Sequence, residues 1–195
     1  EITHGHIKIP MNALEVIIKR KSIPIMDEPG PPSKQLKKIY QAGLRAPDHG
    51  GLQPWKFIEV SGDNRIELGK KFVSVPKNIK KNPSVELVNK VKKAPLRAPL
   101  IIIVIANIKK KTLIPEIEQI LSAGAAAQNM MLASSSMGFH SIWRTGHLAF
   151  NKYINKALKL NKSDVVIGYL YMGSSNKKIP SIKQIKMNKF VKKLG

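Results

Sequence analysis

The chain has 195 residues, a formal net charge of +22 and a hydrophobic fraction of 43%. It contains no cysteine, which excludes disulfides, thiolate metal ligands and a cysteine nucleophile. Its longest strongly apolar run, Leu100 to Ala106, is far shorter than the roughly 18 residues of a membrane span. We expect an N-terminal extension or tag remnant over 1–10 and one domain over 11–195, with an extended tail from about residue 176. The N-terminus shows no secretory signal, so the predicted location is cytoplasmic, without a membrane partner.

The positive charge is carried mainly by lysine. Only five of the 34 basic residues are arginines, and aromatic residues make up 6% of the chain. Specific base readout depends heavily on arginine, and binding of single strands depends on interleaved aromatic side chains. We therefore expect a solvated lysine-rich surface and no specific nucleic-acid partner. A basic nucleic-acid-binding protein remains the alternative from another functional class.

Two helices are predicted before the first strand. Asn12, followed three residues later by Glu15, resembles a capping box and predicts a helix over 13–21. Ser33 is expected to cap a second helix, which brings Arg45 to its C-terminal end. A proline two residues after that arginine prevents the helix from continuing.

The middle of the chain alternates between strand and helix patterns. Residues 56–60 read as a short strand. Residues 65–93 look helical in places, with breaks expected at Pro76 and Pro83. The β-branched run 100–106 predicts a strand buried on both faces at the centre of the sheet.

The second half completes an α+β pattern. A long helix is expected from Pro115, in its first turn, to a stop at Gly138. Strands are predicted over 139–144 and 165–173, with a helix near 150–159 between them. The elements lack a regular βαβ rhythm, and no dinucleotide-binding or Walker signature occurs, so the predicted fold class is α+β.

Three short segments carry candidate chemistry, and the first is "KRKS" at the end of the first predicted helix. Arg20 offers a planar fork for a phosphate, Lys21 a point charge and Ser22 a short donor. The alternative is that these cations only complement the helix dipole. The spacing therefore permits a phosphate site without requiring one.

The second segment is "RAPDHGGLQPW", after the second predicted helix. Two prolines stiffen its backbone, and two adjacent glycines expose backbone amides. Arg45, Asp48, His49 and Gln53 add donors and acceptors. A lone histidine is more often structural, and Trp55 is more often part of the core, but the combination favours a ligand-binding loop.

The third segment is "SIWRTG", at the end of a predicted strand. Trp143, Arg144, Thr145 and Gly146 offer an aromatic face, a guanidinium, a hydroxyl and open backbone. The alternative is a buried indole beside an arginine paired with an acidic residue. No nucleophile or metal motif occurs in the chain, so an enzymatic reading needs an organic cofactor and assigns neither a catalytic side chain nor a metal.

Together, "KRKS", "RAPDHGGLQPW", "RAPLIIIVIA" and "GFHSIWRTG" resemble the flavin-dependent nitroreductase family, in its compact YdjA-like branch, over roughly residues 11–174. The resemblance implies an α+β sandwich whose central, mostly antiparallel sheet is flanked by helices. It also implies an intertwined homodimer with FMN bound at two sites across the subunit interface.

The resemblance assigns cofactor contacts to all three segments. The first would hold the FMN phosphate and ribityl chain, the second would reach the flavin from the opposite subunit, and the third would line the cofactor. Lys21 stands where the family usually has a second arginine, which loses a bidentate fork. The implied contacts are Arg20, Lys21, Ser22, Arg45, His49, Trp143, Arg144 and Thr145, with Gln53 and Gly146 as weaker additions.

The implied activity is hydride transfer from NAD(P)H, as co-substrate, through flavin N5 to a nitroaromatic or quinone-like small molecule, with ping-pong kinetics. A flavin enzyme with another acceptor, such as an enone reductase or a dehydrogenase, is the nearest alternative. A flavin-binding protein without turnover is another.

Overall fold

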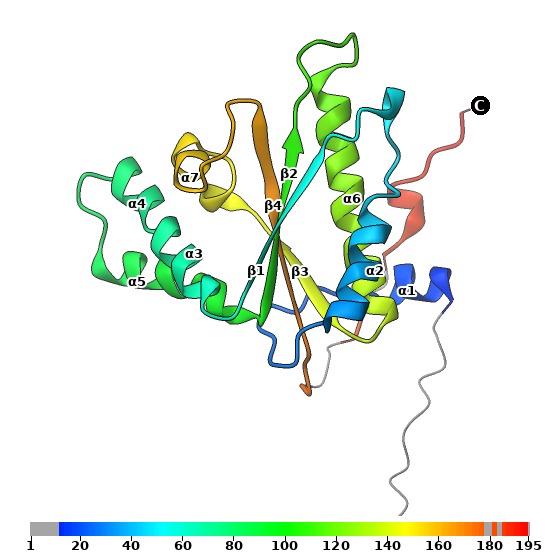
Figure 1. Cartoon of the computed structure of the whole chain (residues 1–195). Coiled ribbons are helices and arrows are strands. Elements are labelled where there is room, and N and C mark those ends of the chain that lie inside the picture. The colour runs from blue at the N-terminus through cyan, green and yellow to red at the C-terminus, as the bar shows by residue number, and fades with distance from the viewer. Residues whose placement is uncertain (1–11, 178–180, 183–184, 195) are drawn as a thin grey trace, which may run out of the picture.

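The computed structural model describes residues 12–177, 181–182 and 185–194 and shows a four-stranded sheet with helices on both faces (Figure 1). The strand order is β1-β2-β4-β3, and each neighbouring pair is antiparallel. The bounds are β1 Trp55–Ser61, β2 Leu100–Asn107, β3 His140–Arg144 and β4 Asp164–Gly173. The predicted α+β class with a mostly antiparallel sheet is confirmed. The predicted extension over 1–10 lies outside the described residues.

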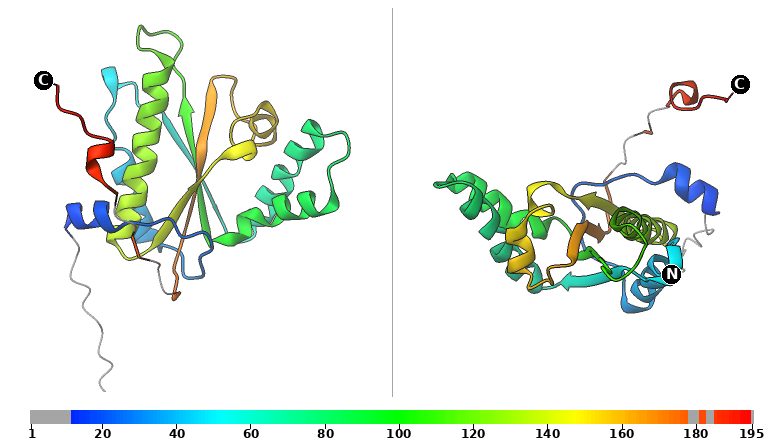
Figure 2. Two further views of the ribbon diagram at one scale, coloured as in Figure 1. Left: turned by 180° about the vertical axis from the view of Figure 1, so that it is seen from behind. Right: turned by 90° about the horizontal axis from the view of Figure 1, so that it is seen from above.

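The helices cover the sheet from two sides. Figure 1 shows α2 and α6 on one side and α3, α4, α5 and α7 on the other, with α1 beside α6. The described part of the segment after residue 176 projects from the body (Figure 2). The bounds are α1 Ala13–Lys19, α2 Ser33–Gly43, α3 Asn64–Phe72, α4 Ser74–Ile79, α5 Val85–Lys93, α6 Glu116–Ser136 and α7 Lys152–Ala157.

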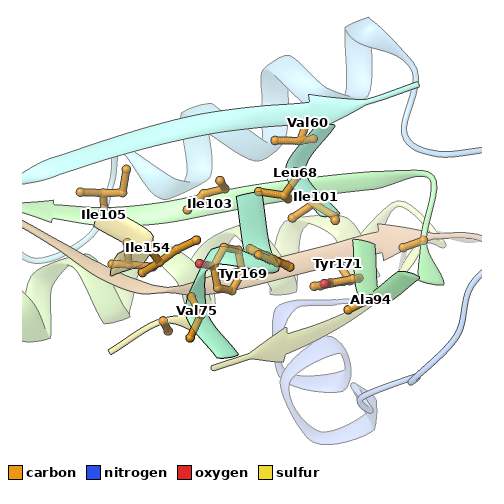
Figure 3. Packing of buried hydrophobic residues seen from close by; sticks show 14 of the residues in the cluster. Val60, Leu68, Val75, Ala94, Ile101, Ile103, Ile105, Ile154, Tyr169 and Tyr171 are labelled. Carbon is orange, nitrogen blue, oxygen red and sulfur yellow. The ribbon is translucent and has the colours of Figure 1, made fainter. Parts of the chain in front are cut away.

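Strand β2 lies inside the sheet and supplies both halves of the core. Its side chains alternate in direction, because successive residues of a strand face opposite sides of the sheet. Ile101, Ile103 and Ile105 join the cluster under α3, α4 and α7, which Figure 3 shows. Ile102 and Val104 join the cluster under α2 and α6. The predicted strand with two buried faces is therefore confirmed.

The start of α1 is as predicted, but its end is not. Asn12 Oδ1 accepts a hydrogen bond from the Glu15 backbone N–H at 2.9 Å, so the predicted cap is confirmed. The helix ends at Lys19 instead of residue 21. Residues after it turn toward the sheet, where Ser22 forms a parallel bridge with Ser141 of β3. This tertiary pairing ends the helix early.

Two other sequence predictions about helices are wrong. Ser33 is the first residue of α2, and Pro32 occupies the N-cap position without a side-chain hydrogen bond. Pro76 lies within the first turn of α4 and does not break it, because the N–H groups of a first turn have no partner inside the helix. Pro83 does lie between helices, as expected, before the Ser84 cap of α5.

The long predicted helix is α6, which begins at Glu116 with Pro115 at the N-cap position and ends two residues before Gly138. It packs along α2 and contacts all four strands of the sheet. Within the described part of the chain, no helix is both long and apolar enough to span a membrane.

Candidate functional site

The first and third candidate segments lie side by side. After α1, the chain runs beside β3, where Ser22 pairs with Ser141 and Ile23 N–H donates to Ser141 O at 3.3 Å. Arg20 and Lys21 therefore lie next to the strand that carries Arg144 at its end. Sequence patterns placed these segments at the ends of separate elements, and the tertiary bridge joins them.

Arg144 is a partly buried cation at the end of β3. Its Nη2 donates to Pro24 O at 2.7 Å, and its guanidinium carbon lies 5.4 Å from the centre of the Tyr171 ring. None of the ion pairs of the described residues includes Arg144, so the predicted alternative of an acidic partner does not apply. Burial first, and then the positive charge of Arg97, lower the pKa of Arg144. A bound anion or polar group would relieve both effects.

Two guanidinium nitrogens in this region are buried and have no hydrogen-bond partner among the described residues. They are Nη1 of Arg20 and Nε of Arg144. Buried donors in folded proteins are nearly always paired, and an unpaired one costs about 1–3 kcal/mol or more when charged. Two such donors on adjacent segments fit a ligand with anionic or carbonyl oxygens, as a flavin phosphate and ring edge would supply.

A cavity of about 350 Å³ lies beside Arg144, between β3, β4 and α5. Its cationic lining consists of Lys90, Arg97 and Arg144, and Tyr171 forms part of its wall. A second cavity of about 340 Å³ adjoins it and is mainly apolar, with lining residues Val75, Pro76, Ile79, Lys80, Leu87, Val91, Thr145, His147 and Leu148. Sequence reasoning missed Arg97 and Lys90, although Arg97 opens the "RAPL" motif just before the central strand.

Trp143 links the third segment to the core. Its Nε1 donates to Ile167 O at 3.2 Å. The indole packs between two glycines, because a methyl group at Gly124 of α6 would lie 3.6 Å from it and one at Gly168 of β4 only 2.1 Å. Trp143 and Thr145 both contribute to the cavity lining, and Thr145 and Gly146 are exposed. The side chain is therefore a packing element as well as part of the wall.

The second segment lies against α6. Ser122 Oγ donates to Pro47 O at 2.6 Å, and His49 Nδ1 lies 2.7 Å from a carboxylate oxygen of Glu118. Asp48 Oδ2 accepts from the Gln53 backbone N–H at 2.7 Å and closes the loop. Arg45 is exposed just beyond α2. Trp55 is half-buried and donates to Ser122 Oγ at 2.9 Å, which fits its structural interpretation.

The model of the nitroreductase family matches residues 17–174. The chain belongs to the nitroreductase family. It is 37% identical over 166 residues to YdjA of Escherichia coli strain K12, whose name describes an NAD(P)H nitroreductase, covering 84% of this chain and 88% of that protein.

Solved structures show the same nitroreductase fold. A nitroreductase-like protein from Bacillus cereus gives a TM-score of 0.82 at 18% identity, covering 96% of this chain and 98% of that one. A Bacteroides fragilis nitroreductase, solved with bound FMN, gives a TM-score of 0.71 at 20% identity, covering 93% and 98% of the two chains.

Within the described residues, a single copy of this chain does not bring all three segments together. No hydrogen bond or ion pair among the described residues joins Arg45 or His49 to Arg20 or Arg144. Figure 1 shows the reason for this separation: the second segment, after α2, lies near the start of α6, whereas α1 lies toward the other end of α6. In the described part of the chain, no group of three or more acidic or histidine side chains is placed to hold a metal ion.

Proposed function

We propose that this nitroreductase is an FMN-dependent homodimer that transfers hydride from NAD(P)H to a nitroaromatic or quinone-like acceptor. The observation that carries the proposal is the pair of buried, unpartnered guanidinium nitrogens of Arg20 and Arg144 on neighbouring segments. The names of the relatives support it, because the Escherichia coli protein is named for NAD(P)H and the Bacteroides fragilis protein was solved with FMN.

The residues present suit the parts of FMN. Arg20, Lys21 and Ser22 would hold the phosphate and ribityl chain, since guanidinium, ammonium and hydroxyl groups all donate to phosphate oxygens. Arg144 would donate from Nε to a polar group of the cofactor, and the exposed backbone of Thr145 and Gly146 leaves room for a flat ring.

FMN, when bound, supplies a hydride carrier at flavin N5. The chain's own task is to hold the rings, donate hydrogen bonds to their polar edge and keep water out. The cavities beside Arg144 offer one region for donor and acceptor, so the two would bind in turn and give ping-pong kinetics. No side chain is required as a nucleophile.

The dimer is supported by apolar side chains that face solvent in one chain. Leu14, Ile17 and Ile18 of α1 are 64%, 55% and 61% exposed, and Ile117 and Leu121 of α6 are 57% and 63% exposed. These side chains form two exposed apolar groups, one on α1 and one at the start of α6, and exposed apolar groups of this kind mark interaction sites. A second copy covering these helices would complete the site by bringing its own second segment, with Arg45, His49 and Gln53, to the flavin.

The visible absorbance spectrum of the purified protein tests the proposal most directly. The expected result is a flavin spectrum that bleaches on anaerobic addition of NADPH or NADH and returns when a nitroaromatic or quinone is added. Light scattering should give the mass of two chains. A colourless protein that takes up no added FMN would refute the proposal, and turnover of enones alone would identify a related enzyme with another acceptor.

A further inference from the structure

The loop that follows α2 is held by one face of α6. Ser122 Oγ bonds both Pro47 O and Trp55 Nε1, at 2.6 and 2.9 Å. One turn earlier on α6, Glu118 Oε2 lies 2.7 Å from His49 Nδ1. Residues four apart share a helix face, so Glu118 and Ser122 contact the loop together.

The contact with Glu118 determines which nitrogen of His49 faces away from α6. A carboxylate only accepts hydrogen bonds, so Nδ1 carries the proton. Nε2 is then the nitrogen left for a ligand. It accepts a hydrogen bond when the imidazole is neutral and donates one when the imidazole is protonated. The His49 side chain is 66% exposed in the single chain, so a neighbouring subunit or its ligand can reach this edge.

We propose that Glu118 is a positioning residue that presents His49 Nε2 to the FMN bound by the other subunit. This inference rests on the proposed function, in which His49 reaches the flavin across the dimer interface. Without the carboxylate, the imidazole exchanges tautomers and rotates about its side-chain bonds. Restoring one orientation on binding then costs conformational entropy, which weakens the affinity for FMN.

The backbone of the loop does not depend on Glu118. Asp48 Oδ2 closes the loop through the Gln53 N–H, and Ser122 anchors Pro47. Replacing Glu118 should therefore free the His49 ring while the loop keeps its place. This separation allows a positioning role to be distinguished from a general loss of structure.

The chain offers a matched control in the same turn of α6. Glu116 also carries a first-turn charge, which complements the helix dipole, but it pairs with Lys110 instead of the loop. Glu118→Leu should raise the Kd for FMN by about three- to tenfold, because the charged hydrogen bond between His49 and Glu118 is lost. The Kd is measured by flavin fluorescence when FMN is added to the apo-dimer. Glu118→Gln should recover most of the affinity, because its amide oxygen still accepts from Nδ1–H, and Glu116→Gln should leave Kd unchanged.

A second measurement reports the ring itself. Nitrogen-15 NMR of histidine-labelled, FMN-loaded dimer should show His49 protonated at Nδ1 in the wild type and in Glu118→Gln, and a tautomer mixture in Glu118→Leu. His49→Gln assigns the signal, and in that background Glu118→Leu should no longer change Kd. The inference fails if Glu118→Leu binds FMN like Glu116→Gln, or if its effect persists without His49. A wild-type protein that takes up no FMN would instead overturn the proposed function, and this inference with it.

Discussion

Gly168 of β4 lies directly under the Trp143 indole, and an added methyl group there has no space. At Gly168→Ala, the new Cβ would lie 2.1 Å from Trp143 Nε1, 2.6 Å from its Cδ1 and 2.9 Å from Arg144 O. The backbone φ of +156° is also one that side chains rarely adopt. The indole must therefore move, and the neighbouring backbone of Arg144 restricts where it can go.

The size of the effect follows from these contacts. Overpacking a well-filled site costs about 1–3 kcal/mol. A displaced indole also loses the hydrogen bond from Nε1 to Ile167 O, and leaving that donor buried and unpaired costs about 1–3 kcal/mol more. We expect the free energy of unfolding to fall by about 2–6 kcal/mol, and FMN retention to weaken because Arg144 adjoins the displaced residue.

The opposite side of the same indole supplies the control. A methyl group at Gly124 of α6 would lie at an ordinary contact distance of 3.6 Å from Trp143 Cη2. Gly124→Ala should therefore be neutral or stabilise the protein by up to about 1 kcal/mol through helix propensity. Urea unfolding, followed by circular dichroism at equal protein concentration with saturating FMN, measures both variants. Equal stability of Gly168→Ala and Gly124→Ala would refute the packing argument.

Two further predictions concern FMN retention and acid stability. Arg20→Ala should weaken FMN binding by on the order of 1.5–3 kcal/mol, measured by equilibrium dialysis. Lys19→Ala removes an exposed charge that pairs with Glu15 of the same helix, and it should have little effect on FMN binding. An equal loss of FMN affinity in both variants would argue against a phosphate contact at Arg20. Burial by itself raises the pKa of Asp164, but hydrogen bonds from Asn107, a backbone N–H and Lys56 outweigh it and lower that pKa. Its contribution to stability is therefore present above the pKa of the unfolded chain and is lost as pH falls through the folded value, so Asp164→Asn should flatten the acid limb of a stability–pH curve from urea titrations.

Much of the fold could be predicted because its signals are local. The β-branched run of β2 needs burial on both faces, and the Asn12 cap depends on a backbone N–H three residues away. The errors arose where distant residues compete with local preference. The bridge from Ser22 to β3 accompanies the early end of α1, and Pro76 is accepted inside α4 because the helix starts only two residues earlier.

The sequence by itself determined the order of elements, the buried strand and the three polar segments, because hydrophobic period, caps and turn residues act over a few positions. Only the tertiary structure decided which groups meet. It brought the segment after α1 alongside β3, packed Trp143 between Gly124 and Gly168, and placed Glu118 in contact with His49. These contacts join residues far apart along the chain, and their geometry depends on how the helices pack on the twisted sheet.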